Sequence, residues 1–264
     1  MSILLTSLSS GSCGNCLFFQ VEDDAYLVDV GIRAEQIEKG LDQIGVSFNR
    51  IRGIFVTHEH QDHILGLEDM LRRRNIPVIF PRVLQNFSPF SACLNAGSIP
   101  FEPSKKFYVG KMEVLPVPVP HDALSPVGFV FSYCGVQIAY FVDLGSVPSA
   151  LQTLLKQVDV LVIESNHDVR MLEEGPYPSH LKRRIRGPKG HLSNIQTGRF
   201  LQQVIPNLQK PVQVFLAHLS AVNNSPEVAL HTVEDMIRSQ RKSGEVFLDY
   251  FPRGTVSKLW EKRL

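Results

Sequence analysis

Three histidines and two carboxylates stand within six consecutive residues near the end of the first quarter of the chain. They belong to the segment Thr57-His58-Glu59-His60-Gln61-Asp62-His63, which directly follows the apolar run Ile54-Phe55-Val56. Imidazole nitrogens and carboxylate oxygens are the ligands that Zn²⁺ and similar divalent ions prefer. A solvated polar loop is the alternative interpretation. The order and density of these groups instead favour a metal site on a loop after a strand.

The spacing within this segment indicates how it can serve two metal ions. His58 and His60 are two residues apart, so in an extended backbone they project to the same side and can bind one ion. Asp62 and His63 follow where the chain begins to turn, so they can face a second ion. Two ions about 3.5–4 Å apart can share a hydroxide and stabilise both the attacking and the leaving oxygen of a hydrolysis.

Three further candidate ligands, His121, Asp143 and His218, each stand just after an apolar, strand-like run. One such residue alone would more often be a turn or core residue. Because all three have the same placement, we expect them to converge on one edge of a sheet. The runs that precede them are 112–119, 137–142 and 212–217.

This ordered set of motifs resembles the metallo-β-lactamase-fold hydrolase superfamily. Within it, the chain resembles the bacterial YycJ branch (also WalJ or VicX), whose members are described as metal-dependent DNA exonucleases. The resemblance extends from the first expected strand to about Glu227. The segments that carry it are 9–15, 57–63, 141–145, 164–168, 177–182, 190–194, and 216–220 with Asn223-Asn224.

The expected fold follows partly from the pattern and partly from the resemblance. Apolar and alternating runs alone indicate a mixed α/β domain. The resemblance implies a four-layer αββα sandwich formed by a single domain over residues 1–264. Strands are expected at 3–8, 17–21, 26–29, 51–56, 77–80, 112–119, 127–133, 136–142, 158–164, 212–216 and 246–248, and helices at 34–44, 67–74, 147–157, 192–204 and 226–242.

The resemblance also implies how the ligands divide between two metal ions. One ion is held by His58, His60 and His121, the other by Asp62, His63 and His218, and Asp143 bridges both. Zn²⁺ suits the histidine-rich set best, and Mn²⁺ or Fe would accept the same site. Because antibiotic-hydrolysing members of the superfamily lack a bridging Asp at this point, β-lactam hydrolysis is disfavoured.

Four residues are expected to act in catalysis or to orient the metal ligands. Asp62 and His191 are the candidate catalytic residues, and His191 is expected to open the helix near Leu192, where it would bind the scissile phosphate or protonate the leaving oxygen. A helix-capping or surface histidine is the alternative for His191. Glu164 and His167 are expected to orient metal ligands.

A basic cluster precedes His191 and is the candidate substrate-binding surface. A Gly- and Pro-containing basic loop beside a metal site could hold phosphates, although most charge runs are solvated faces. Arg72, Arg73 and Arg74 form a second cluster that we interpret as surface. The expected substrate-binding residues are Lys182, Arg183, Arg186, His191 and Asn194.

Composition indicates a protein outside membranes. The chain of 264 residues has 44% hydrophobic and 20% charged residues and a net charge of +1. It has no apolar run near the ~20 residues that cross a bilayer and begins without a secretory leader. Four cysteines in a chain this long predict no disulfide framework, so we expect the cytoplasm. The pair Cys13 and Cys16 is interpreted as two thiols in a loop.

The sequence and the resemblance together predict a dinuclear metal-dependent phosphodiesterase that acts on DNA in the manner of a 5′–3′ exonuclease, with a metal-bridging hydroxide as the nucleophile. Exonuclease polarity itself has no signature in the sequence. Two other classes stay open. One is a hydrolase of a small ester, thioester or cyclic phosphodiester, which a near-neutral net charge allows. The other is a regulatory protein that keeps its metals for stability alone. Oligomeric state and protein partners have no signature in the sequence.

Overall fold

The structure is a computed structural model that describes residues 2–94, 97–238 and 246–264. The chain divides into two compact units. Unit 1 comprises residues 1–105, 123–126 and 252–264, and unit 2 comprises residues 106–122 and 127–251. Whether they count as one domain, as the sequence predicts, stays a prediction. In the described part of the chain, none of the helices combines the length and the hydrophobicity of a membrane span.

Unit 1 contains a mixed sheet in the order β14-β1-β2-β3-β4-β5-β6, seven strands among the described residues. Strands β14, β1, β2 and β3 pair antiparallel, whereas β3 to β6 pair parallel. The strands are β1 (Ser2–Ser9), β2 (Cys16–Val21), β3 (Asp24–Val28), β4 (Ile51–Phe55), β5 (Val78–Pro81), β6 (Ile99–Phe101) and β14 (Trp260–Arg263).

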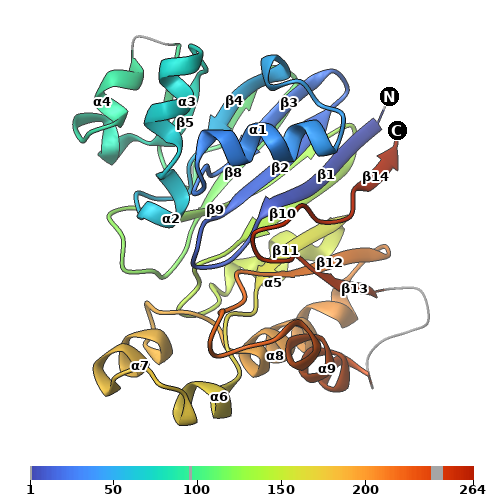
Figure 1. The fold of residues 1–264 in the computed structure, drawn as a ribbon. Helices are drawn as coiled ribbons and strands as arrows, with labels where there is room; N and C mark the ends of the chain where they lie inside the picture. The colour runs from blue at the N-terminus through green and yellow to red at the C-terminus, as the bar shows by residue number, and fades with distance from the viewer. Residues whose placement is uncertain (1, 95–96, 239–245) are drawn as a thin grey trace. The chain divides into compact units, whose positions relative to one another are not determined.

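Helices α1 and α3 cover one face of the unit 1 sheet (Figure 1). In α1, Ala34, Ile37 and Leu41 recur at helical spacing and are fully buried in the core of this unit. A Leu41→Ala change would therefore cost about 2–5 kcal/mol of stability. The helices of unit 1 are α1 (Ala34–Gln43), α2 (Gln61–Ile64), α3 (Leu67–Arg73) and α4 (Phe90–Cys93).

Unit 2 repeats the plan with a second mixed sheet, ordered β13-β12-β11-β10-β9-β8-β7, again seven strands within the described ranges. Strands β7 to β10 pair antiparallel and β10 to β13 pair parallel. The strands are β7 (Phe107–Val109), β8 (Met112–Pro118), β9 (Val127–Tyr133), β10 (Val136–Phe141), β11 (Val160–Glu164), β12 (Val212–Ala217) and β13 (Val246–Tyr250).

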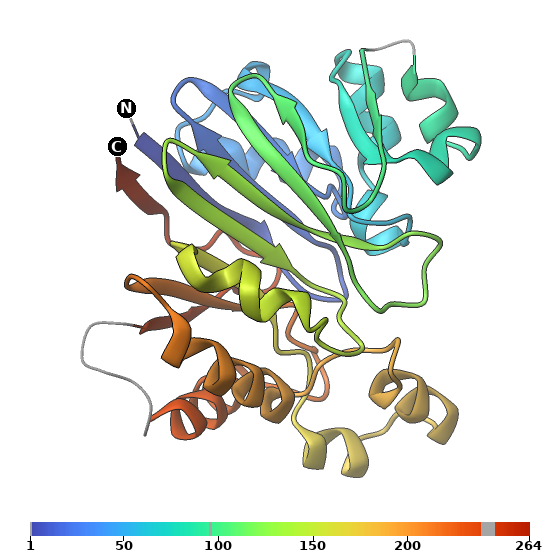
Figure 2. The ribbon, with the colours of Figure 1, turned by 180° about the vertical axis from the view of Figure 1, so that it is seen from behind.

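The helices of unit 2 begin at recognisable capping residues. Helix α8 starts after a reciprocal capping box between Ser193 and Gln196, and α9 starts after Ser225 with a proline in its first turn. Helices α8 and α9 lie side by side (Figures 1 and 2). The helices are α5 (Ala150–Leu154), α6 (Val169–Glu174), α7 (Ser179–Arg186), α8 (Asn194–Val204) and α9 (Pro226–Ile237).

Most expected elements are present with small differences at their ends, and several short elements were not predicted. The helix expected over 147–157 is shorter, because α5 begins only at Ala150, after Pro148, and continues as a 3₁₀ turn at 155–157. Helix α9 ends at Ile237, and residues 239–245 of the helix expected to 242 lie outside the described residues. The sequence missed the short helices α2, α4, α6 and α7 and strands β6, β7 and β14.

Candidate metal centre

The histidine-rich segment follows strand β4, as the sequence predicts. His58 and His60 lie on the loop after the strand, and Asp62 and His63 lie in helix α2. The imidazole centroid of His58 is 4.6 Å from that of His60 and 4.1 Å from that of His63. His58 and His63 are buried, while His60 and Asp62 are half-buried. Unit 1 therefore gathers four of the seven expected ligands into one cluster.

Asp29, at the end of β3, fixes the orientation of His63. Its Oδ2 lies 2.7 Å from Nδ1 of His63, and its Oδ1 accepts a hydrogen bond of 2.9 Å from the backbone N–H of Thr57. Asp29 is fully buried, and although burial raises its pKa, His63 and the hydrogen bonds from Thr57 oppose that shift. A metal-binding histidine commonly donates its second N–H to a carboxylate in this way.

The loop between β1 and β2 supports the same cluster from the other side. The backbone N–H of Asn15 donates to the carbonyl oxygen of Asp62 at 2.8 Å, and the Asn15 amide lies 3.1 Å from Nε2 of His63. Gly31 is required where the chain passes Asp62, because a Cβ at this position would lie 1.7 Å from that carbonyl oxygen. Gly31 was not singled out from the sequence.

Unit 2 places its candidate residues at the carboxyl ends of neighbouring strands. Asp143 follows β10, Glu164 ends β11, and His218 follows β12. These three strands run parallel, so their ends meet at the same edge of the sheet. One possible ligand atom from each of Asp143, Glu164, His191 and His218 lies within 4.8 Å of the others. Asp143 and His218, two of the three residues expected to converge, therefore lie close together at this edge.

Glu164 is the hub of the unit 2 cluster. Its Oε1 lies 2.8 Å from Nδ1 of His218 and 2.8 Å from Nδ1 of His191. Its Oε2 accepts hydrogen bonds from the backbone N–H groups of Leu144 at 2.8 Å and Leu192 at 3.0 Å. Burial alone would raise the pKa of this carboxyl, but the two histidines lower it to about 2. Glu164 therefore stays ionised and binds the Nδ1 side of both rings.

His121 is held through its Nδ1 atom as well. This atom lies 3.2 Å from the carbonyl oxygen of Gly190, while Nε2 lies 3.9 Å from Oδ1 of Asp143. A ring that donates from Nδ1 can coordinate a metal through Nε2. Arg184 of α7 binds Asp122, the next residue, at 2.7 Å. The loop after β8 is thereby anchored to α7.

Among the described residues, six non-glycine residues adopt the left-handed conformation that L-residues seldom occupy, and three of them stand at strand ends in the two clusters. These three are Asp29 at φ 59°, Asp143 at φ 55° and His218 at φ 57°. Such conformations cost about 1–3 kcal/mol each and cluster at functional sites. Two of the three are expected metal ligands and the third orients one, so the backbone is strained where the clusters form.

The basic cluster differs from the expected loop, and that expectation was wrong. Residues 179–186 form helix α7. Lys182 donates to the carbonyl oxygen of Glu173 at 2.7 Å, and Arg186 pairs with the Glu173 carboxylate at 3.0 Å. Arg183 is exposed. Two of the three expected phosphate-binding cations therefore bind α6.

Asn194 also has a different position from the one expected. It is fully buried, and its Oδ1 accepts hydrogen bonds from the Ser165 hydroxyl at 2.7 Å and the Asn224 amide at 2.9 Å. It therefore joins the loops after β11 and β12 to the start of α8. We assign it a positioning role in place of the substrate contact that the sequence indicated.

His191 and His167 lie on the loops beside these strand ends. Helix α8 begins at Asn194, so His191 precedes the cap Ser193 instead of opening the helix. Burial opposes protonation of His191, but Glu164 and Asp143 raise its pKa to about 9. His167 was expected to orient Asp143 or His218. Within the described residues no hydrogen bond joins it to either of them, and Glu164 holds His218 instead.

The donor chemistry of both units fits divalent ions. Each unit offers imidazole nitrogens and carboxylate oxygens in close groups, which suit Zn²⁺, Mn²⁺ or Fe. Each also pairs a candidate ligand histidine with a buried carboxylate, His63 with Asp29 and His218 with Glu164. This carboxylate–histidine arrangement is typical of metal sites.

Comparison with known proteins identifies the class. The sequence model of the beta-lactamase superfamily domain matches residues 26–218, and the chain belongs to this family. The expected metallo-β-lactamase fold is thereby confirmed, and the chain is a metal-dependent hydrolase. The solved metallo-beta-lactamase fold protein YhfI from Bacillus subtilis shares this fold at a TM-score of 0.73 and 15% identity, with 99% of both chains covered.

The relatives fall in the branch that the sequence motifs indicated. The exodeoxyribonuclease YycJ of Bacillus anthracis is 34% identical over 247 residues, which cover 91% of this chain and 91% of YycJ. The exodeoxyribonuclease WalJ of Streptococcus pneumoniae is 29% identical over 234 residues, which cover 87% of this chain and 86% of WalJ. The resemblance to the YycJ and WalJ branch is thereby confirmed.

Proposed function

We propose that this protein hydrolyses phosphodiester bonds of DNA as a 5′–3′ exonuclease with two bound divalent ions. The single observation that carries the proposal is that Oε1 of Glu164 lies 2.8 Å from Nδ1 of both His218, a proposed ligand, and His191. Relatives named exodeoxyribonucleases over nearly the whole chain support DNA as the substrate.

The family pattern gives the proposed ligand set. It assigns His58, His60 and His121 to one ion, Asp62, His63 and His218 to the other, and Asp143 to both. When bound, such ions lower the pKa of a shared water from 15.7 towards ~7 and neutralise charge on the non-bridging oxygens of a phosphodiester. The metal can be Zn²⁺, Mn²⁺ or Fe, because the donor set is compatible with each.

His191 supplies the proposed proton. Oε1 of Glu164 lies 2.8 Å from its Nδ1, so Glu164 holds that side of the ring. Its other nitrogen can then donate to a phosphate oxygen or to the leaving oxygen. Asp62, half-buried in α2, lies beside His63 and is proposed to orient the attacking water as well as to bind metal.

The proposed location is the cytoplasm. All four cysteines are free, with Cys13 and Cys134 exposed and Cys16 and Cys93 buried. Free exposed thiols persist in a reducing compartment. DNA is the proposed partner.

The test is a nuclease assay on duplex DNA labelled separately at the 5′ and 3′ ends, with metal-free protein to which Mn²⁺ or Zn²⁺ is added back. We expect shortening from the 5′ end, and loss of it in His58→Ala and Asp62→Ala. His231→Ala, which changes an exposed histidine of α9, is the matched control. Hydrolysis of small esters without any cleavage of DNA would show the small-molecule alternative instead.

A further inference from the structure

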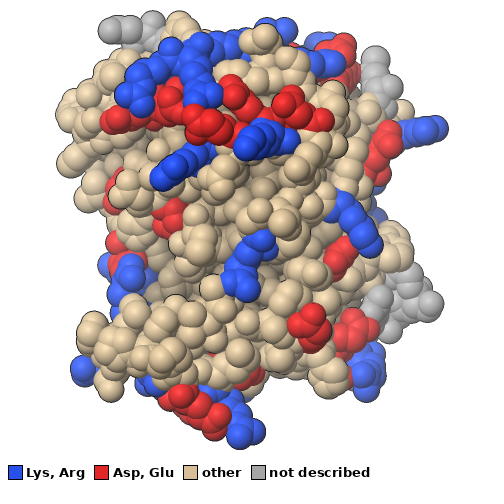
Figure 3. All heavy atoms as spheres, viewed as in Figure 1, with Lys and Arg blue, Asp and Glu red and all other residues tan. Residues whose placement is uncertain are grey.

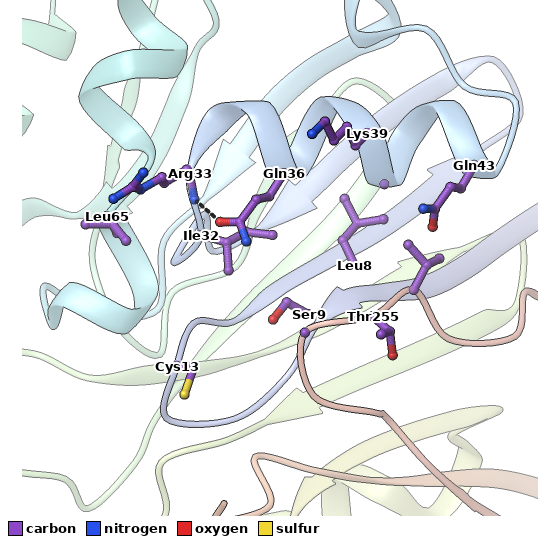
Figure 4. Close-up of a pocket in the computed structure, with 13 residues that line it drawn as sticks. Leu8, Ser9, Cys13, Ile32, Arg33, Gln36, Lys39, Gln43, Leu65 and Thr255 are labelled. Atoms are coloured by element: carbon purple, nitrogen blue, oxygen red, sulfur yellow. Dashed lines mark hydrogen bonds between the residues drawn. The ribbon is translucent and has the colours of Figure 1, made fainter.

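A groove in unit 1 has no role in the proposed chemistry. It runs along helix α1 beside the C-terminal segment 254–256, with a volume of about 350 Å³ (Figure 4). This volume is at the small end of the range for ligand sites, about 300–1,000 Å³. We call it the α1 groove. It is lined by Leu8, Ser9, Cys13, Ile32, Arg33, Gln36, Lys39, Gly40, Gln43, Leu65, Gly254, Thr255 and Val256.

One wall of the α1 groove is polar and positively charged. Gln36, Lys39 and Gln43 recur at helical spacing and line it together, and Arg33 stands at the start of the helix. Among the residues that the structure describes, no acidic side chain lines the groove. Neither Arg33 nor Lys39 forms an ion pair with another residue of the described part of the chain. The groove thus offers two cationic groups to an anion.

The acidic residues of α1 lie outside the lining of the α1 groove. Glu35 and Glu38 both pair with Arg73 of α3, and Asp42 lies outside the groove lining. Figure 3 shows acidic and basic side chains side by side in the upper part of the view. Glu35 and Glu38 thus form ion pairs with Arg73 of α3, while Lys39 lines the groove.

The floor of the α1 groove is aliphatic and preformed. Leu8, Ile32 and Val256 contribute to it, and Gly40 lets α1 approach, because a Cβ there would lie 3.3 Å from Leu8 and 3.4 Å from Val256. The C-terminal segment is tied to β1, since the Ser257 N–H donates to the carbonyl oxygen of Ser7 at 2.8 Å. A ligand would therefore meet a fixed apolar surface beside cations.

Two residues that line the α1 groove belong to segments that carry or support candidate ligands of unit 1. Leu65 follows directly after α2, which carries Asp62 and His63. Cys13 belongs to the loop whose Asn15 donates to the carbonyl oxygen of Asp62. The groove and these candidate ligands therefore belong to the same unit.

We propose that the α1 groove binds one nucleotide of a nucleic-acid strand, independently of base identity, and so holds the substrate beside the reacting phosphate. Arg33 and Lys39 bind backbone phosphate, and the aliphatic floor packs against sugar or base. A single strand fits better than a duplex because the groove has the volume of a small ligand. This inference rests on the proposed function, since it concerns the substrate of the same site.

The test measures binding without cleavage. A fluorescent 12-nucleotide oligothymidine is titrated with the full chain in excess chelator, and anisotropy gives the affinity at several salt concentrations. The variant is Arg33→Gln with Lys39→Gln. The control, Arg72→Gln with Lys105→Gln, makes the same change of charge at exposed residues outside the groove.

We expect the groove variant to bind about tenfold more weakly than the control. Its plot of log affinity against log salt should be shallower by about 1.4, because each phosphate contact to a single strand contributes about 0.7. The oligonucleotide should also protect the exposed thiol of Cys13 from a maleimide and leave the exposed Cys134 reactive.

Equal affinities of groove and control variants, or an unprotected Cys13, would overturn the groove assignment. If DNA is still cleaved in the presence of metal, the proposed function stands and only the groove fails. A wild-type chain that neither binds the oligonucleotide nor cleaves DNA would refute both the groove assignment and the proposed function.

Discussion

Nδ1 of His218 lies 2.8 Å from Oε1 of Glu164. The histidine follows β12 in the left-handed conformation and the glutamate ends the neighbouring β11, so the pair depends on the parallel register of the two strands. The contact fixes the Nδ1 side of the ring and directs Nε2 to coordination. Glu164 thus orients a proposed metal ligand.

The change Glu164→Gln tests this relationship. Gln keeps the size of the side chain and removes the charge that both histidines bind. We expect metal affinity to fall about 10–100-fold, as for other partners of ligand histidines. Titration of metal-free protein with Zn²⁺ measures it. Glu173→Gln, on the exposed helix α6, is the control, and equal affinities in the two variants would refute the orienting role.

Asp29→Ala should destabilise unit 1. Asp29 is fully buried, and the change leaves the Thr57 N–H and Nδ1 of His63 without their acceptor. Each buried group that loses its acceptor costs about 1–3 kcal/mol, so the free energy of unfolding in urea should fall by at least ~2 kcal/mol. Asp23→Ala removes an exposed carboxylate and should change it by less than ~0.5 kcal/mol. A similar small effect for Asp29→Ala would contradict the account.

Because of His167, the free energy of unfolding of the metal-free protein should fall in acid. Burial lowers the pKa of His167 from 6.5 to about 4, so the folded state stays neutral where the unfolded state gains a proton. The stability it contributes is therefore full above pH 6.5 and is lost as the pH falls towards 4. Urea unfolding in chelator between these pH values should show the decline, and His167→Gln should make it shallower. An identical slope in the variant would exclude His167 as the cause.

Strand ends were the part of the site that the sequence predicted well. Apolar runs mark where β4, β10 and β12 end, and a polar residue just after each run is placed at a sheet edge by the strand itself. Asp29 carries the same signal after β3 but was missed, because its role depends on contact with His63, which is 34 residues away. The hydrophobic pattern of a sequence places a residue at the end of a strand, but it does not show which distant side chain that residue contacts.

The basic cluster shows the opposite case. Its Gly and Pro residues suggested a loop, yet Leu181 and Ile185 are four residues apart, and Ile185 is buried in a helix that ends at Arg186. The helical spacing of these two apolar residues was overlooked because charged residues surround them in the sequence. The partners of Lys182 and Arg186 come from α6, a helix that the sequence reading did not predict.

The metal content of the purified protein tests the central claim most directly. We propose that the clusters of the two units hold two ions, so elemental mass spectrometry of the reconstituted chain should find two per chain. His58→Ala and Asp143→Ala should each lower that number, and His231→Ala should leave it at two. A wild-type chain that retains no divalent ion, or an unchanged content in both ligand variants, would contradict the account.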